Sequence, residues 1–318
     1  MRDISSYDLN IIIKPSNIEE CYCQYESKSY KMCYAPPFAP NLLGKRFNCN
    51  SLEFLYYADL LEPKAKIEVK NEDFSKIPIL AAASENHVEE TKEMLYFVRK
   101  LWPEKKVILY DLGLTEETRN ELKTYCNFEL RAFPFELFPP YVKNLKEYRW
   151  KPLIIAMTLL EFNTIWYMDS SVRWLKAEMD KYYEMIRCRE RDRIKNFTDN
   201  DDCTKSPFLM LIEAGHGIYT STHPGIYSYL TTDLERIKNV TELGTGILLI
   251  AGTRESKELI KWYVNCSLMK IYEEFILCGY FVHSKKSVWL RKIPKYLAIS
   301  AAILFMQILY AIDMINRL

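Results

Sequence analysis

The sequence predicts an α/β fold built on a mostly parallel, doubly wound sheet. Between Ile77 and Ser170, short apolar runs alternate with helical patterns, beginning and ending with a strand. Such alternation is typical of parallel strands joined by crossover helices. The chain has 318 residues, 49% of them hydrophobic, which suffices for one large α/β domain or two small ones. Because only 9 residues are glycine, a collagen-like chain is excluded.

The four strands of this region are short apolar runs, and its three helices have helical spacing or typical first turns. Strands are expected at 77–84, 105–113, 128–135 and 164–170, and helices at 88–102, 115–126 and 151–162. The first strand, "IPILAAAS", has the continuous apolar character of a buried parallel strand. The second helix opens with Thr115 and an acidic first turn, which suits the positive end of a helix dipole. Pro152 suits the first turn of the third helix.

Three parts are expected along the chain. Residues 1–74 form an irregular segment, because "APPFAP" at 35–40 blocks helices and central strands; a short helix at 51–63 is the exception. Residues 75–285 form the α/β domain, and residues 286–318 form a basic segment followed by an apolar helix. Within the domain, later elements are expected as a charged helix and polar loop at 179–205, strands at 206–215 and 244–253, and a helix at 256–276.

The C-terminal apolar run and the overall charge bear on possible partners. Residues 297–312 form a run of 16 residues without charge, whereas a membrane span needs about 20. We expect a buried C-terminal helix, with membrane contact through 297–312 as the alternative. The net charge of +1 gives no bulk attraction to nucleic acid, so no nucleic-acid partner is expected.

Cysteine is concentrated near the N-terminus, where four of the nine cysteines are Cys21, Cys23, Cys33 and Cys49. Their spacing lacks the paired C-x₂-C knuckles of a zinc ribbon. We therefore expect a segment tied by disulfides, with free buried thiols as the alternative.

Sequons and cysteines favour a glycoprotein of the secretory pathway, either lumenal or membrane-associated. Glycosylation acceptor sequons begin at Asn196, Asn239 and Asn265. The first 13 residues contain no signal peptide, because their apolar run at 10–13 is shorter than an h-region of about 7–15 residues. Either the N-terminus is incomplete, or the lumenal assignment is wrong.

The strand at 164–170 ends in polar residues, which raises the question of their chemistry. Asp169 lies at the carboxyl end of an interior strand, where a doubly wound sheet binds its ligands. The first strand ends in the small residues Ala81 to Ser84, which would let a flat base or a ribose approach the backbone. No G-x-G-x-x-G or G-x-x-x-x-G-K-[ST] motif is present, so a dinucleotide fingerprint and P-loop chemistry are excluded.

Four stretches, "YDLGL", "FPFELFP", "EYRWKPLIIA" and "WYMDSSVRW", resemble a nematode-rich family of uncharacterised proteins, domain of unknown function 1647. With the strand "GTGILLI", the pattern is also similar to the GT-A fold of nucleotide-sugar glycosyltransferases, particularly glycogenin-like ones. The resemblance covers about Cys21 to Tyr280. It implies an enzyme of the Golgi lumen that moves a sugar from a nucleotide-diphosphate sugar to a glycan or glycoprotein acceptor.

Candidate site residues follow from the strand ends and from this resemblance. Asp169 is the expected catalytic carboxylate and metal ligand, and Glu213 is a candidate general base. Contacts to nucleotide, phosphate or sugar are expected from Ala83, Ser84, His87, Arg149, Lys151, Ser171, Arg173, His223, Thr245 and Gly246. Each also has a structural interpretation, as a cap, a turn former or a surface ion-pair partner.

The sequence departs from the glycosyltransferase pattern beside Asp169. The pattern Asp-x-Asp holds Mn²⁺ or Mg²⁺, which neutralises the diphosphate leaving group, but here the second acid is Ser171. Three hypotheses stay open. Asp169 binds a metal ion with help from His223 or Glu213, or fixed cations such as Lys151, Arg149 and Arg173 replace the metal ion. Otherwise, the protein is a catalytically inactive, glycosyltransferase-like binding protein.

Overall fold

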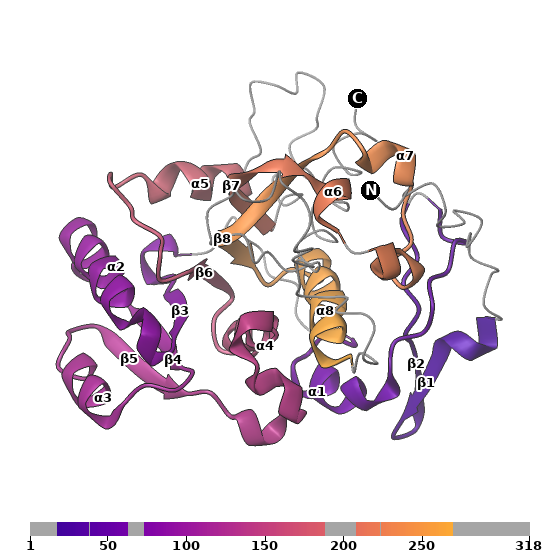
Figure 1. The fold of residues 1–318 in the computed structure, drawn as a ribbon, viewed down its shortest axis with the longest axis horizontal. Coiled ribbons are helices and arrows are strands. Elements are labelled where there is room, and N and C mark those ends of the chain that lie inside the picture. The colour runs from indigo at the N-terminus through magenta and orange to yellow at the C-terminus, as the bar shows by residue number, and fades with distance from the viewer. Residues whose placement is uncertain (1–17, 38, 63–72, 188–207, 223, 270–318) are drawn as a thin grey trace, which may run out of the picture.

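The computed structural model describes residues 18–37, 39–62, 73–187, 208–222 and 224–269 (Figure 1). The C-terminal helix expected within 286–318 lies outside these residues, as do the run 297–312, His223 and the sequon at Asn196. Within the described parts of the chain, no helix is both long and apolar enough to cross a membrane.

A six-stranded sheet forms the centre of the fold, in the order β5-β4-β3-β6-β8-β7. Neighbouring strands from β5 to β6 are parallel, whereas β8 runs antiparallel to both β6 and β7. The prediction of a mostly parallel sheet is therefore confirmed. The strands are β3 (Ile79–Ala83), β4 (Val107–Asp111), β5 (Phe128–Ala132), β6 (Thr164–Met168), β7 (Phe208–Gly217) and β8 (Thr241–Ala251).

Two hydrophobic cores cover the two faces of the sheet. Along β6, Ile165 and Tyr167 belong to one core, and Trp166 and Met168 belong to the other. Because both faces are buried, the strand reads as a continuous apolar run. The first core receives α1 (Leu52–Tyr57), α4 (Trp150–Leu159) and α8 (Arg254–Leu268), and the second receives α2 (Val88–Leu101), α3 (Glu116–Leu122) and α5 (Met179–Arg187). Two short helices, α6 (Ile218–Ser221) and α7 (Leu234–Ile237), lie between β7 and β8 in the chain.

The N-terminal segment is tied by disulfides, as predicted. The hairpin of β1 (Tyr22–Tyr25) and β2 (Lys28–Lys31) lies between Cys21 and Cys33, which form one bond, and Cys23 bonds to Cys49. Aromatic and aliphatic side chains of this segment enter the first core, so side chains from both sides of the expected boundary at residue 74 pack together.

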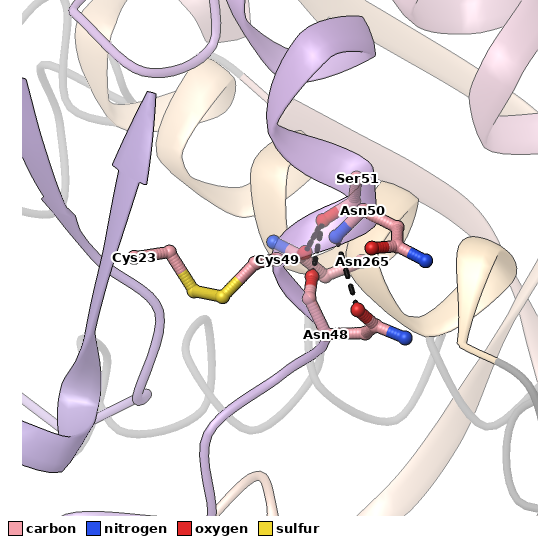
Figure 2. The surroundings of a disulfide bond; sticks show 6 residues. All are labelled: Cys23, Asn48, Cys49, Asn50, Ser51 and Asn265. Atoms are coloured by element: carbon pink, nitrogen blue, oxygen red, sulfur yellow. Dashed lines mark hydrogen bonds between the residues drawn. A yellow bond between two sulfur atoms is a disulfide. The ribbon is translucent and has the colours of Figure 1, made fainter. Parts of the chain in front are cut away.

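Asn265 links α8 to this disulfide segment (Figure 2). Its Oδ1 accepts a hydrogen bond of 2.7 Å from the Ser51 hydroxyl, and its side-chain amide donates to the Lys261 carbonyl. Asn265 is only 2% exposed. The expectation that its sequon offers a glycosylation site is therefore not met in the folded chain, whereas Asn239 is exposed.

The chain changes direction across the sheet between β3 and β6. From β3 the chain moves outward to β4 and β5, and it then returns to the other side of β3 to form β6. Pairing of β3 with β4 continues to Ala83 and Asp111, whereas pairing of β3 with β6 ends at Leu80 and Tyr167. This is a topological switch point, and open α/β sheets bind ligands at the carboxyl ends of the strands at such points.

Candidate functional site

Asp169 lies at this switch point, directly after β6. Its carboxylate Oδ1 accepts a hydrogen bond from the Tyr167 hydroxyl and lies 2.9 Å from the Lys151 ammonium. Its backbone N–H donates to the Gly246 carbonyl on β8 at 2.8 Å. The side chain is 31% exposed. Asp169 is therefore a carboxylate fixed by three neighbours but still reachable from solvent.

Lys151 is a buried cation in the first turn of α4, and only 4% of the residue is exposed. Its ammonium lies 4.8 Å from the centre of the Tyr167 ring and 5.5 Å from that of Tyr148. A buried ammonium loses its hydration, and here a carboxylate and two aromatic faces compensate for that loss. Burial and the charge of Asp169 raise the pKa of Tyr167 well above its ordinary value, so its hydroxyl remains a donor.

Tyr148 closes the loop before α4 in an unusual backbone conformation. Its φ of 52° lies in the left-handed region, which is uncommon for a residue other than glycine. Burial and the carboxylates of Asp169 and Glu90 raise the pKa of its hydroxyl. Backbone conformations of this kind cluster at functional sites. We therefore add Tyr148 to the candidate site, where the sequence carried no signal for it.

Glu90 on α2 connects the ends of β3 and β6. Its Oε2 lies 2.9 Å from His87 Nδ1 and accepts a hydrogen bond of 3.4 Å from the Ser170 hydroxyl. Ala83 is buried at the end of β3, and the Ser84 hydroxyl donates to the Asn86 side chain. The residues that follow β3 thus lie beside those that follow β6, as the sequence predicts. Glu90 itself was not predicted, although it lies one helical turn after His87.

Gly246 borders the carboxylate from the side of β8. A side chain at this position would place its Cβ 3.5 Å from Asp169 Oδ2 and 3.7 Å from Ile212. The glycine therefore keeps space beside the second carboxylate oxygen. Thr245 is 3% exposed, and as the adjacent residue in the strand it points to the opposite face of the sheet.

Other predicted residues are engaged elsewhere. The Arg149 guanidinium binds Glu147 and the carbonyls of Ser267 and Met269 at the end of α8. It does not reach Asp169, so we leave Arg149 out of the site. The Arg173 guanidinium bonds to Glu93 on α2 at 2.6 Å and to the carbonyls of Ser170 and Val172. Arg173 thereby fixes the turn that carries Asp169.

Ser171 and Glu213 are both exposed. Ser171 lies in the turn after Asp169. On β7, Ile212 faces Gly246, and because neighbouring strand residues point to opposite faces, Glu213 points away from Asp169. The structure therefore brings Ala83, Ser84, His87, Lys151, Asp169 and Gly246 to one edge of the sheet, and it does not bring Arg149 or Glu213 there.

The resemblance to domain of unknown function 1647 is confirmed for the part of the chain that contains the site residues up to Lys151. Residues 20–156 match the family model described as "Protein of unknown function (DUF1647)". The match covers less than half of the chain. The DUF1647 match contains β3, His87, Glu90 and Lys151, whereas Asp169 and Gly246 follow it in the chain. No curated protein sequence matches the chain.

Several solved structures resemble the chain in part. The galactosyltransferase LgtC, solved with donor and acceptor sugar analogs, shares 13% identity and a TM-score of 0.37, over 61% of this chain and 67% of LgtC. The mannosyltransferase Ktr4p from S. cerevisiae shares 9% identity and a TM-score of 0.37, over 70% of this chain and 72% of Ktr4p. The bifunctional glycosyltransferase WbbM shares 9% identity and a TM-score of 0.38, over 62% of this chain but only 35% of WbbM.

The residues around Asp169 do not fit the expected Mn²⁺ or Mg²⁺. Such ions need several oxygen ligands, and Ser171 replaces the second carboxylate. Among the residues that the structure describes, no group of three or more His, Cys, Asp or Glu side chains could hold a metal ion. A dication at Asp169 would also meet the Lys151 ammonium, and a dication and a unit positive charge 4 Å apart near a protein surface repel by about 8 kcal/mol.

A cavity of about 1030 Å³ lies apart from this site. Its walls are mostly apolar and include Phe54, Tyr57, Phe138 and Leu160. Leu160 follows the last turn of α4, whereas Lys151 lies in its first turn, so the two sites lie about 14 Å apart along the helix. Of the predicted site residues that the structure describes, none lines this cavity.

A second polar cluster joins β7, α6 and β8. The buried Glu242 carboxylate accepts a hydrogen bond from the Ser221 hydroxyl, and its Oε2 lies 3.0 Å from His216 Nδ1. Burial raises the pKa of Glu242 to about 7, and the Ser221 hydrogen bond opposes this rise only in part. The sequence did not reveal this cluster, because the three residues belong to different elements.

We expect Glu242 to make stability depend on pH. In the unfolded chain the Glu242 carboxyl releases its proton near pH 4.5, whereas in the folded chain it holds the proton to about pH 7. Between these values the unfolded chain binds fewer protons, so the free energy of unfolding falls as the pH rises. Glu242→Gln should reduce the change in the free energy of unfolding, measured by urea unfolding, between pH 5 and 8. At pH 8 the variant should be more stable than wild type by about 1–3 kcal/mol. Exposed Glu213→Gln is the control, and a profile unchanged by Glu242→Gln would contradict this assignment.

Proposed function

We propose that this protein transfers a sugar from a nucleotide-diphosphate sugar to a hydroxyl group of a glycan or protein acceptor. The observation that carries the proposal is the position of Asp169. This fixed and partly exposed carboxylate directly follows β6 at the switch point of a doubly wound sheet, and β6 pairs with β3, which ends in small residues. The proposal also rests on the resemblance of the sequence motifs to nucleotide-sugar glycosyltransferases.

Each part of the site suits one part of the reaction. The end of β3 and the start of α2 provide the small residue Ala83 and the polar side chains of Ser84 and His87 for contact with the nucleotide. Asp169 accepts hydrogen bonds from hydroxyl groups of the donor sugar and so orients it. Gly246 carries no side chain, so an acceptor hydroxyl can approach the backbone beside Asp169 Oδ2.

The chemical step is a substitution at the anomeric carbon. The acceptor oxygen forms a bond to that carbon, and the bond from the carbon to the phosphate oxygen breaks. The nucleoside diphosphate leaves with the electron pair, and the acceptor proton passes to the leaving phosphate or to solvent. The two disulfides suit an oxidising compartment, so we place this activity in the lumen of the secretory pathway.

A screen of donor hydrolysis tests this function. We expect the wild-type protein to release nucleoside diphosphate from at least one nucleotide sugar, and Asp169→Asn to lower this rate by about 100-fold, because the fixed negative charge at the reacting centre is lost. Asp180→Asn, an exposed aspartate on α5, is the matched control and should retain the rate. Equal rates for wild type and Asp169→Asn would remove Asp169 from the mechanism.

Binding without turnover is the second candidate function. Ser171 in place of an acid, and the neutralisation of Asp169 by Lys151, both favour it. In that case, nucleotide or glycan would stabilise the protein against thermal unfolding, and no donor would be hydrolysed. The same hydrolysis screen, with a melting measurement on each ligand, separates the two functions.

A further inference from the structure

We propose that this site binds the diphosphate of its donor without a divalent cation, and that Lys151 supplies the positive charge in its place. This inference rests on the proposed function and specifies how its substrate is held. It follows from what stands beside the Asp169 carboxylate in the folded chain.

The Lys151 ammonium already occupies the cation position at Asp169. Its Nζ lies 2.9 Å from Oδ1, and the residue is 4% exposed. Secondary structure positions both residues of this ion pair, because Lys151 lies in the first turn of α4 and Asp169 directly follows β6. The carboxylate therefore presents little net negative charge, and the attraction that would recruit a dication is already satisfied.

The ammonium also retains capacity for a phosphate. A lysine ammonium has three N–H donors, and its one ion-pair partner among the described residues is Asp169 Oδ1. The other contacts are the rings of Tyr148 and Tyr167, and an aromatic face holds a cation less strongly than a charged oxygen does. Tyr167 is fully buried, whereas Tyr148 is partly exposed. A phosphate oxygen would therefore replace the Tyr148 ring beside Lys151.

The neighbouring arginines do not offer the same charge. Arg173 is paired with Glu93, and Arg149 is paired with Glu147. Their guanidiniums also bind backbone carbonyls, as described above. Among the predicted cations, Lys151 is the one that contacts Asp169.

Calorimetric titration of nucleoside diphosphates tests the inference. UDP, GDP, CDP and ADP are titrated into the protein in EDTA and, separately, in Mn²⁺. We expect at least one of them to bind, with a Kd that changes by less than about threefold between the two conditions. Lys151→Met should weaken that binding in EDTA by about 10–100-fold, because a charge-assisted hydrogen bond is lost.

A matched control is available on α8. Lys257 is also a buried lysine, paired with Asp59, and α8 begins beyond the amino end of β6, opposite to Asp169. Lys257→Met should leave nucleotide binding unchanged. Lys151→Arg keeps the charge and should retain more affinity than Lys151→Met. Circular dichroism confirms that each variant is folded.

The outcomes separate the inference from the proposed function. If the wild-type protein binds a nucleoside diphosphate only with Mn²⁺, or if Lys151→Met binds it as tightly as wild type does, the inference is overturned while the proposed function stands. If no nucleoside diphosphate binds in either condition, the proposed function fails as well.

Discussion

Reduction of the two disulfides is expected to lower the free energy of unfolding by about 2–4 kcal/mol for each bond. The bonds Cys21–Cys33 and Cys23–Cys49 close loops with sequence separations of 12 and 26 residues. Each restricts the unfolded chain, and the restriction grows slowly with loop length. We therefore expect the second bond to contribute slightly more than the first.

Urea unfolding with and without reductant measures this effect, and paired cysteine-to-serine variants separate the two bonds. Cys126→Ser is the control, because Cys126 is an exposed free cysteine. The segment also reaches α8 through the hydrogen bond between Ser51 and Asn265. We thus expect the loss to appear in the main unfolding transition. An early, separate transition of small amplitude would show that the segment unfolds independently of the sheet.

Local chemistry explains why the alternating region was predicted well. Thr115 caps α3, where its hydroxyl accepts from the Thr118 N–H, and the apolar run of β3 is buried along its whole length. These signals lie within a few residues of the elements they define. The ends were less predictable. β5 stops at Ala132, three residues before the predicted end, and Pro134 beyond it has no N–H to continue the ladder.

For β8, the predicted strand is too short at its start. The apolar pattern predicts a strand from residue 244, whereas β8 begins at Thr241 and pairs there with Gly217. Thr241 is exposed and Glu242 is polar, so hydrophobicity carried no signal for these residues. Backbone pairing with β7, a tertiary interaction, extends the strand.

The candidate site was predictable only where a strand end or a helix start fixed a residue's position. Lys151 and Asp169 are 18 positions apart in sequence, and both follow such boundaries, so their meeting could be anticipated from the fold class. Arg149 is only two residues before Lys151, yet residues at this spacing on a helix do not face the same side. Its guanidinium turns to the end of α8 instead. The environments of Tyr148 and Glu242 depend on tertiary packing and leave no local pattern.

Removal of the Asp169 carboxylate is expected to cost more stability than removal of its partner. Asp169→Ala leaves the Lys151 ammonium, 4% exposed, without a counterion, and breaking a buried pair in this way costs about 3–5 kcal/mol. Lys151→Met leaves a carboxylate that is 31% exposed and still accepts from Tyr167, so water solvates it. We expect this variant to lose about 1 kcal/mol.

A double-mutant cycle tests whether the two charges stabilise each other. The variant Asp169→Ala/Lys151→Met contains neither charge, so it should be more stable than Asp169→Ala alone, although it carries one substitution more. Urea unfolding of the four proteins at pH 7 gives the coupling energy. Additive losses would mean that the two charges do not interact in the folded chain, and would contradict this expectation. For activity measurements, Asn is therefore a better substitution than Ala at position 169, because its amide oxygen can still accept a hydrogen bond from the Lys151 ammonium.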